Sequence, residues 1–354
     1  MSIILDCDLM RYRNTGLYHY CLNVGMRVNA LLKVQRAPLM KMYVPVAEAN
    51  AFGTAYPCIT EKPWHKFIKP FLWNCRVWHA PFQSGRIIPD KNKNSSCKVL
   101  LTIHDLNALH EGRSADDQQR SVNHTQRLIN KSDALVCISE FTKSDVLKNC
   151  DVGNKPVYVI HNGTHKVHQP LFKNSTVKPS RPFLFGMGDL NTKKNYHVLL
   201  PLLQQNPDID MVIAGRLAEP DYISHIKNTA EAMGISDRLY VTGPVPEEEK
   251  AWYLCNCLAF VHPSLAEGFG APVVEAMSFG KPLFLSSLTS LPEIGGNIAF
   301  YFSSFDPEHM QQVFQEGMRR YTNEEMYPAI IQRGKEFDWE RNAVKYLEVY
   351  KSLY

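Results

Sequence analysis

The chain has 354 residues, of which 45% are hydrophobic, 21% charged and 11% aromatic. This composition excludes a largely disordered chain, because it provides enough apolar surface for about two domains of roughly 150 residues each. The net charge of +4 permits an anionic ligand or membrane surface, but it lacks the clustered basic charge of a nucleic-acid-binding protein.

Short apolar segments alternate with longer helical patterns along the whole chain. Strands are predicted at residues 3–6, 42–46, 77–80, 99–103, 135–138, 157–160, 183–186, 211–214, 239–241, 258–261, 283–285 and 299–302. Each segment is apolar at consecutive positions, which is typical of parallel strands covered by helices on both faces. The repeated strand–helix order predicts an α/β protein with two doubly wound, Rossmann-like domains.

The N-terminus and the cysteines both bear on the cellular compartment of the protein. Asp6 and Asp8 interrupt the apolar start of the chain, where a signal peptide would continue. No apolar run reaches the ~18 residues of a membrane span. Nine cysteines have no regular spacing, so reduced, mostly buried thiols are the simplest interpretation. We expect a cytoplasmic protein that at most lies on the inner face of a membrane.

The segment KPWHKFIKPFLWNCR, residues 62–76, combines aromatic and basic side chains. Trp64, Phe67, Ile68, Phe71 and Leu72 recur at spacings of three and four, with Lys62, Lys66, Lys69 and Arg76 among them. On a helix this pattern is typical of a segment on an anionic membrane. The alternative is a helix whose stripe packs on the first sheet; Pro70 interrupts an ideal helix.

The stretch from His161 to Arg181 is the best candidate for a linker, because it contains Asn162-Gly163, Pro170 and Pro179 and lacks periodicity. We therefore expect one domain over residues 1–170 and a second over residues 171–337.

Residues 338–354 predict a closing helix that can return to the first domain. Its apolar stripe consists of Ala343, Tyr346, Leu347 and Tyr350. Two open parallel sheets facing each other would form a cleft at the carboxyl ends of their strands. Such a cleft suits an enzyme, but it does not identify the reaction.

The segment FVHPSLAEGFGAPVVEAMSFGKP, residues 260–282, carries the strongest chemical signal. A predicted strand ends in a loop with Glu267, a glycine turn follows, and a helix is predicted from Ala271 to Phe279. Backbone N–H groups of such a turn and helix start bind anions. Glu275 can accept hydrogen bonds from adjacent hydroxyls such as those of a ribose, and Glu267 from those of a further sugar. A bare pair of glutamates at this spacing is, however, more often a solvated surface pair.

Metal and redox sites are not expected. His161, His165 and His168 have a helical spacing, but Asn162-Gly163 breaks the helix. The chain lacks HExxH, Walker, GxSxG and CxxC motifs, and no GxGxxG follows the first strand. We therefore expect neither a metal nor a cofactor.

The stretch PSLAEGFGAPVVEAMSFGKP resembles the donor-site signature of retaining glycosyltransferases of family 4, which have the two-domain GT-B fold. The resemblance continues in SLTSLPEIGG and, upstream, in VTGPVPEEEKAWYLCNCLAFV. LLTIHDL, VCISEFTKSDV and VIHNG in the first half, and the closing FDWERNAVKYLEVY, are also similar to family segments. The similarity is most specific over residues 239–296.

This resemblance implies a role for individual residues. Glu275 would bind the donor ribose, Glu267 would face the donor sugar, and Lys194 would be the cation on the phosphates. His104 would lie near the reacting sugar from the other domain, and the small Gly16 would let the first loop approach the phosphates. The turn that meets the diphosphate consists of Gly268, Phe269, Gly270 and Ala271.

One departure from the family pattern concerns the second phosphate-binding cation. Many members carry an arginine where this chain has Gly188, and Arg-Lys where it has Lys193-Lys194. Lysine cannot present the planar fork of arginine to a phosphate. The second cation would be Lys193 or Arg216, and the sequence leaves both open.

The expected function is therefore retaining, metal-independent transfer of a hexose, with mannose suggested by family habit. The donor would be a GDP- or UDP-sugar bound by the second domain. The acceptor would be a glycan or a lipid-linked glycan in surface polysaccharide assembly, bound by the first domain. The alternatives are a non-catalytic nucleotide-sugar-binding protein and another GT-B enzyme, such as an epimerase or a phosphorylase.

Overall fold

The computed structural model divides into two compact units. Unit 1 combines Met1–Gly163 with Asp338–Tyr354, and unit 2 is the continuous stretch Thr164–Phe337. The structure describes residues 2–13, 15–67, 72–84, 87–89, 96–164 and 177–354. The predicted domain boundary at residue 170 lies outside the described residues.

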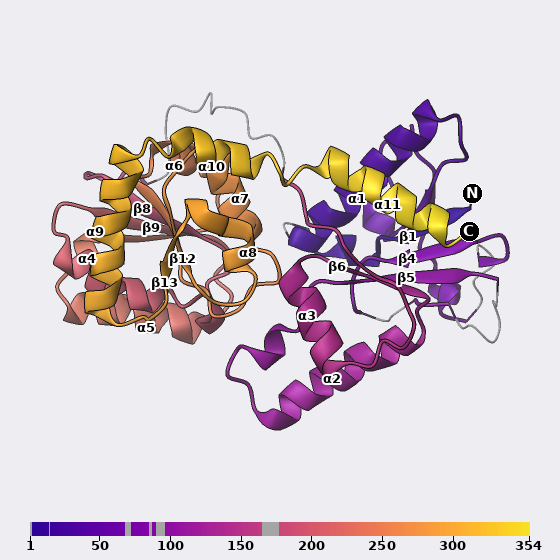
Figure 1. Ribbon diagram of the computed structural model, residues 1–354, viewed down its shortest axis with the longest axis horizontal. Coiled ribbons are helices and arrows are strands. Elements are labelled where there is room, and N and C mark those ends of the chain that lie inside the picture. Colours follow the sequence, from indigo (N-terminus) through magenta and orange to yellow (C-terminus); the bar gives the residue numbers. More distant parts are fainter. Residues whose placement is uncertain (1, 14, 68–71, 85–86, 90–95, 165–176) are drawn as a thin grey trace. The chain divides into compact units, whose positions relative to one another are not determined.

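Among the residues that the structure describes, unit 1 has a parallel sheet of seven strands in the order β3-β2-β1-β4-β5-β6-β7 (Figure 1). The strands are β1 (Ile3–Asp6), β2 (Lys41–Val44), β3 (Cys58–Thr60), β4 (Val77–Ala80), β5 (Lys98–Ile103), β6 (Ala134–Cys137) and β7 (Val157–Val159). The four-residue strands β1, β4 and β6 are buried throughout, as expected for strands with helices on both faces. The edge strand β3 was not predicted from the sequence.

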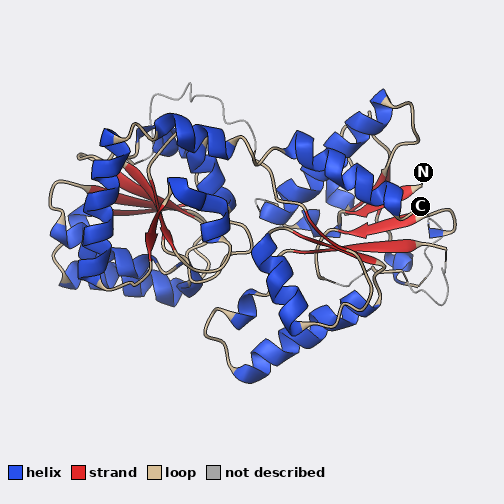
Figure 2. Ribbon diagram, viewed as in Figure 1, coloured by secondary structure: helices blue, strands red, loops and turns tan. Residues whose placement is uncertain are grey.

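Helices cover both faces of this sheet (Figure 2). They are α1 (Gly16–Val34), α2 (Ala115–Asn130), α3 (Glu140–Asn149) and α11 (Trp339–Ser352). Thr15, Ser114, Ser139 and Asp338 begin these helices as N-caps whose side chains accept backbone N–H bonds. Helix α11 packs against α1, and its apolar stripe, Tyr346 and Tyr350 included, is buried in the core of unit 1.

The described part of unit 2 has six parallel strands in the order β10-β9-β8-β11-β12-β13. The strands are β8 (Phe183–Met187), β9 (Asp210–Ala214), β10 (Leu239–Gly243), β11 (Ala259–His262), β12 (Leu283–Ser286) and β13 (Phe300–Phe302). The helices are α4 (Leu200–Gln205), α5 (Pro220–Ala232), α6 (Glu247–Asn256), α7 (Ala271–Met277), α8 (Leu291–Gly295), α9 (Pro307–Asn323) and α10 (Tyr327–Gly334). The strand order reverses between β8 and β11, and such a switch point is where open sheets bind ligands.

Two predicted helices differ from the structure. The helix expected to end at Phe279 is α7, which ends at Met277. Residues 62–76 form a short 3-10 helix over Pro63–Lys66; their predicted helix is not formed in the described part, and residues 68–71 lie outside it. Its stripe is not buried as a unit, because Phe67 is 85% exposed while Leu72 is 3% exposed.

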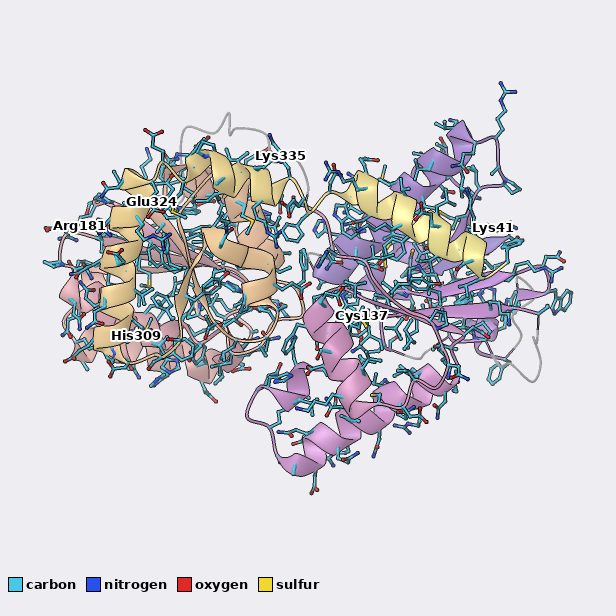
Figure 3. All side chains as sticks on the ribbon, in the orientation of Figure 1. Lys41, Cys137, Arg181, His309, Glu324 and Lys335 are labelled. Carbon is cyan, nitrogen blue, oxygen red and sulfur yellow. The ribbon has the colours of Figure 1, made fainter. Side chains whose placement is uncertain are left out.

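The cysteines carry no cross-links. All nine are free thiols, most of them buried, and Cys137 on β6 is an example (Figure 3). No helix among the described residues is long and apolar enough to cross a membrane.

Candidate active site

A buried ion pair lies at the switch point of the unit 2 sheet. Lys194 belongs to the short helix η6 (Thr192–Lys194), in the loop that follows β8. Its ammonium pairs with the carboxylate of Glu267, in the loop that follows β11. Each residue is only 8% exposed, so most of the water that would screen this pair is excluded. The structure thus brings together two of the three predicted catalytic residues.

Local turn geometry explains how Lys194 reaches this position. The side chain of Asn191 caps η6 by accepting the Lys194 N–H at 3.2 Å. Asn195 then takes a left-handed conformation with φ 58°, which asparagine tolerates better than most residues. The backbone of Leu265 donates to the Lys193 carbonyl at 2.9 Å. This bond ties the two loops of the site together.

The loop after β12 holds the backbone of Glu267. The Glu267 N–H donates to Thr289 Oγ1 at 2.9 Å, and Ser290 Oγ donates to the Glu267 carbonyl at 2.9 Å. Both hydroxyls belong to the segment SLTSLPEIGG that resembles the family pattern. Sequence analysis found this segment but missed its role, which is to position Glu267.

His262, the last residue of β11, is a further member of the site that sequence analysis missed. Its Nε2 lies 2.8 Å from Glu267 Oε1, the oxygen that also pairs with Lys194. Since a carboxylate only accepts hydrogen bonds, Nε2 must carry the proton. Burial lowers the pKa of His262 despite the adjacent carboxylate. The histidine is therefore a neutral donor that fixes one oxygen of Glu267.

These neighbours determine the charge state of Glu267. Burial alone would raise its pKa, but the charge of Lys194 and the His262 hydrogen bond outweigh burial and hold the pKa well below its usual range. Glu267 is therefore a carboxylate at neutral pH. Its Oε1 atom is occupied by two donors, so Oε2 is the oxygen left to accept from a ligand.

The predicted phosphate-binding turn is buried at Gly268, Phe269 and Gly270, and Ala271 is half-buried. Gly270 has φ 89°, a conformation that favours glycine, and a Cβ there would meet Leu291 Cδ2 at 3.0 Å. Phe269 is 3% exposed, and its ring packs edge-on against Phe337 at a centroid distance of 5.5 Å. Only the backbone of Phe269 can therefore serve the predicted site, because the ring anchors the turn to the core. Ala271 begins α7 directly after this turn.

Glu275, the predicted ribose ligand, pairs with a lysine that sequence analysis did not single out. Lys250 on α6 places its Nζ 2.9 Å from Glu275 Oε2 and 2.6 Å from a carboxylate oxygen of Glu247. The side chain of Lys250 is 13% exposed and that of Glu275 is 22% exposed. The signal in the sequence was the lysine that ends EEEK, four residues into α6.

The two candidates for a second phosphate cation differ in their surroundings. Arg216 makes a bidentate pair with Asp189, at 2.6 and 3.2 Å, and its side chain is 67% exposed. Lys193 adjoins Lys194 and contributes to the lowered pKa of Glu267, so its charge acts on the buried pair.

The surroundings of position 188 explain why this chain has glycine there. A Cβ at this position would lie 3.1 Å from Lys194 Cε, and the carbonyl of Gly188 would be 1.9 Å from a Cβ at Gly215. Both glycines have positive φ angles, 147° and 142°. The two loops thus approach so closely that an arginine at position 188 would compete with Lys194 for space.

The remaining predicted residues lie in unit 1. His104 follows β5, is 8% exposed, and donates from Nε2 to the Pro81 carbonyl at 2.8 Å. Burial lowers the pKa of His104 to about 4, so its ring is neutral at pH 7. Gly16 is the first residue of α1, and a Cβ there would meet no described atom within 4 Å. The packing of the described residues therefore does not require glycine at position 16.

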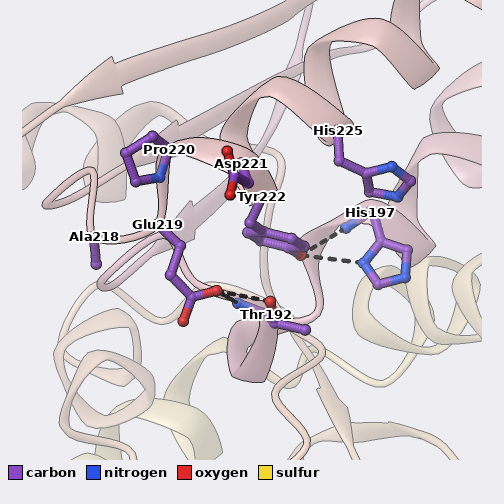
Figure 4. Close-up of a pocket in the computed structure, with 8 residues that line it drawn as sticks. All are labelled: Thr192, His197, Ala218, Glu219, Pro220, Asp221, Tyr222 and His225. Carbon is purple, nitrogen blue, oxygen red and sulfur yellow. Dashed lines mark hydrogen bonds between the residues drawn. The ribbon is translucent and has the colours of Figure 1, made fainter.

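A cavity of about 660 Å³ opens beside the site in unit 2. Figure 4 shows its lining, which comes mainly from the start of α5 and the segment that follows η6: Thr192, His197, Ala218, Glu219, Pro220, Asp221, Tyr222 and His225. Glu219 accepts from the Thr192 N–H at 2.9 Å. The cavity contains neither Glu267 nor Glu275, and its link to the ion pair is Thr192, two residues before Lys194.

Comparisons with known proteins agree with the two-unit fold. Residues 168–337 match the family described as "Glycosyl transferases group 1", and residues 68–166 match "Glycosyltransferase Family 4". The sucrose-phosphate synthase of Thermosynechococcus elongatus has TM-score 0.76 at 16% identity, covering 100% of this chain and 99% of that one. Anabaena HepE in complex with UDP and glucose has TM-score 0.73 at 16% identity, covering 99% and 100%.

Two curated relatives are mannosyltransferases. The serotype-specific mannosyltransferase WbdA of Escherichia coli is 26% identical over 283 residues, which is 73% of this chain but 34% of that protein. The lipopolysaccharide core biosynthesis mannosyltransferase LpsB of Rhizobium meliloti is 26% identical over 245 residues, covering 65% of this chain and 64% of LpsB. The matched part thus spans about a third of WbdA.

Two doubly wound parallel units of this kind define the GT-B class of glycosyltransferase folds, which confirms the predicted fold class. The two family matches are matches of sequence, and together they span residues 68–337 apart from residue 167. The chain belongs to the group 1, family 4 glycosyltransferases.

Proposed function

We propose that this protein transfers a hexose, with mannose favoured, from a GDP- or UDP-sugar to a glycan or lipid-linked glycan in surface polysaccharide assembly. The observation that carries the proposal is the buried Lys194–Glu267 pair at the switch point of unit 2. The similarity to WbdA and LpsB, both mannosyltransferases, supports mannose as the sugar.

The buried pair suits a reaction in which negative charge develops on a leaving diphosphate. A lysine held in a water-poor site stabilises that charge more strongly than a hydrated one would. Lys194 fills this role, with Lys193 as the second cation, because the charge of Lys193 also acts on the buried pair. The lysines supply the charge stabilisation that a divalent ion gives in other transferases, so we propose a metal-independent reaction.

The state of Glu267 favours retention without a covalent intermediate. Its Oε1 atom is engaged by Lys194 and His262, and its pKa is held low, so it is a weak nucleophile. We assign Glu267 to the hydroxyls of the donor hexose. The acceptor hydroxyl then attacks from the face that the diphosphate leaves, and the departing phosphate takes the acceptor proton.

Other residues are assigned to binding. Glu275 accepts from the donor ribose, and the Gly268–Gly270 turn with Ala271 meets the diphosphate. In unit 1, His104 is assigned to the reacting sugar as a neutral group, and Gly16 to the diphosphate.

The test is a turnover assay with purified protein and GDP-mannose, GDP-glucose, UDP-glucose and UDP-galactose, using a lipid-linked glycan extract as acceptor. We expect nucleoside diphosphate release that depends on acceptor, persists in EDTA, and yields a product with the donor's anomeric configuration by NMR. Donor binding without turnover would favour the non-catalytic alternative, and an epimerised donor would favour an epimerase. Activity lost in EDTA and restored by Mn²⁺ would contradict metal independence.

A lipid-linked acceptor is supported by exposed aromatic residues in unit 1. Trp64, Phe67 and Trp73 are 45%, 85% and 75% exposed, and the Lys62 ammonium lies 5.8 Å from the Trp64 ring centroid. Aromatic rings beside cations are the combination that binds anionic membrane surfaces. We propose that these three exposed aromatic residues, Trp64, Phe67 and Trp73, contact the membrane that presents the acceptor.

Vesicle sedimentation tests the membrane contact. We expect wild-type protein to co-sediment with vesicles containing anionic lipid at low salt, and a variant with serine at the three aromatic positions to remain in solution. Val34→Ser is the matched control, because Val34 is 84% exposed on α1. Equal sedimentation of the wild type, the triple serine variant and Val34→Ser would show that the three aromatic residues do not contribute to membrane binding.

A further inference from the structure

The ammonium of Lys250 lies between two carboxylates of unit 2. It is 2.6 Å from an oxygen of Glu247 and 2.9 Å from Oε2 of Glu275. The exposed fraction of the side chain is 13% for Lys250, 22% for Glu275 and 78% for Glu247. The lysine therefore joins a solvated glutamate at the start of α6 to a largely buried one on α7.

The contact distinguishes the two oxygens of Glu275. Oε2 is buried beside Lys250, and no described residue gives it a well-aligned hydrogen bond. The contact is thus an ion pair in which charge matters more than direction. Because Oε2 is covered, the exposed part of the Glu275 side chain lies elsewhere, and Oε1 is the oxygen that can accept from a ligand.

The charge of this cluster indicates which ligand it suits. Burial would lower the pKa of Lys250, but Glu275 and Glu247 outweigh burial and raise the pKa above its usual value. Lys250 is therefore an ammonium at neutral pH. One ammonium between two carboxylates leaves a net negative cluster, which repels a phosphate but accepts hydrogen bonds from neutral hydroxyls.

We infer that Lys250 is a positioning residue that fixes Glu275 so that the site selects a ribonucleotide donor over a 2′-deoxyribonucleotide. This inference rests on the proposed donor site. Without Lys250, the half-buried Glu275 would turn toward water, and the hydroxyls of the ribose would lose a prepositioned acceptor. A nucleotide without the 2′-hydroxyl has less to gain from that acceptor, and sites built to bind a hydroxyl reject analogues that lack it.

The test measures the affinities of GDP, 2′-deoxy-GDP, UDP and 2′-deoxy-UDP by calorimetry for wild type and Lys250→Met. For the base that binds, we expect wild type to prefer the ribose form by about tenfold or more, as one charge-assisted hydrogen bond provides. In Lys250→Met this preference should fall below about threefold, through weaker binding of the ribose form alone. With an active donor, KM should rise while kcat stays within about twofold, because ribose binding is the same in ground and transition states.

Three further variants separate positioning from general damage. Lys250→Arg keeps the charge and should keep most of the ribose preference. Lys250→Met leaves the carboxylates of Glu247 and Glu275 without the ammonium between them, and their repulsion could destabilise the fold. Adding Glu247→Gln removes one of the two charges. Thermal unfolding of both variants would show whether a folding defect is present. Lys227→Met is the matched control, because Lys227 is an exposed lysine on α5, and it should change neither affinity.

The outcomes separate the inference from the proposed function. Equal weakening of ribose and deoxyribose forms, or no change in either, would overturn the role of Lys250 while leaving the donor site intact. Failure of wild type to bind any of the four nucleotides would overturn the donor site and the inference with it.

Discussion

The two units share one architecture but bury different kinds of polar group at the carboxyl ends of their strands. In unit 2 the buried groups are charged: Lys194 pairs with Glu267 and Lys250 with Glu275. Unit 1 instead buries a neutral network, in which His79 is hydrogen-bonded to Thr102 at 2.8 Å and to the hydroxyl of Tyr350 at 2.7 Å. The buried carboxylates that follow its first two strands, Asp8 and Glu48, pair with the more exposed Arg11 and Arg13. The difference shows that the parallel-sheet frame does not dictate the chemistry, which depends on the side chains that follow the strands.

The neutral network of unit 1 continues to the candidate site. The Tyr20 hydroxyl is hydrogen-bonded to Thr102 at 3.1 Å and also to Tyr346. The ring of Tyr20 packs edge-on against His104 at a centroid distance of 4.9 Å. Burial lowers the pKa of His79 to about 3 and that of His104 to about 4, so neither ring is charged at pH 7.

The largest effect should come from breaking the charged pair of unit 2. Lys194→Met leaves Glu267 buried without its counter-ion, which we expect to cost about 3 kcal/mol of unfolding free energy and most of the turnover. Urea denaturation measures the change in unfolding free energy. Arg319→Met is the matched control, because it breaks an exposed pair with Glu316 and should cost at most about 1 kcal/mol. Equal losses of unfolding free energy in Lys194→Met and Arg319→Met would mean that burial does not strengthen the pair between Lys194 and Glu267.

Glu267→Gln should be milder for folding and severe for turnover. The amide keeps the size of the side chain but loses the charge that pairs with Lys194 and that we propose binds the hexose hydroxyls. We expect kcat to fall about a hundredfold, as for the loss of one electrostatic contact in a transition state, with a smaller change in donor KM. Glu316→Gln serves as an exposed comparison. Unchanged steady-state kinetics would show that Glu267 is structural.

Gly16→Leu tests unit 1, where the site is proposed to need space and not charge. A Cβ at this helix start meets no described atom within 4 Å, so we expect stability to change by at most about 0.5 kcal/mol. Donor affinity should fall at least about tenfold if the first loop approaches the diphosphate. Normal donor affinity in the folded variant would remove Gly16 from the site.

Acidification should also lower the free energy of unfolding, by little just below pH ~6.5 and by more as the pH falls further. His79 and His104 have folded pKa values of about 3 and about 4, below the usual ~6.5 of an unfolded histidine. The unfolded state therefore binds more protons between these values, so stability is full above pH ~6.5 and falls as the pH is lowered toward 4.

Unfolding midpoints measured at intervals from pH 7 to pH 4.5 would show this slope. His79→Gln removes the contribution of this histidine and should make the slope shallower. A slope that is identical in wild type and variant would show that His79 does not contribute.

The fold was largely predictable because consecutive apolar residues identify buried parallel strands. The exception is β3, whose short segment CIT is only half-buried at the edge of the sheet. The helix predicted over residues 62–76 is not formed in the described part, and helical spacing of aromatic residues does not show which of them are exposed. Pro63 begins a 3-10 turn there instead of an α-helix.

The site was predicted residue by residue but not as an arrangement. Lys194 and Glu267 were each found, yet their pairing spans 73 positions and depends on how two loops meet. His262 was not predicted as a site residue, because a single histidine at the end of a strand forms no sequence motif. Phe269 was predicted as a ligand contact because a motif gives the residue but not the direction of its ring.

Helix α11 also has a consequence for synthesis on the ribosome. Domains generally fold in the order in which they emerge, and unit 2 is one continuous stretch of the chain. Unit 1 emerges first, but Trp339, Tyr346 and Tyr350 belong to its core and follow the whole of unit 2 in the sequence. Unit 2 can therefore complete its fold before unit 1 does. Until α11 emerges, the part of α1 that packs against it in the folded protein therefore stays uncovered.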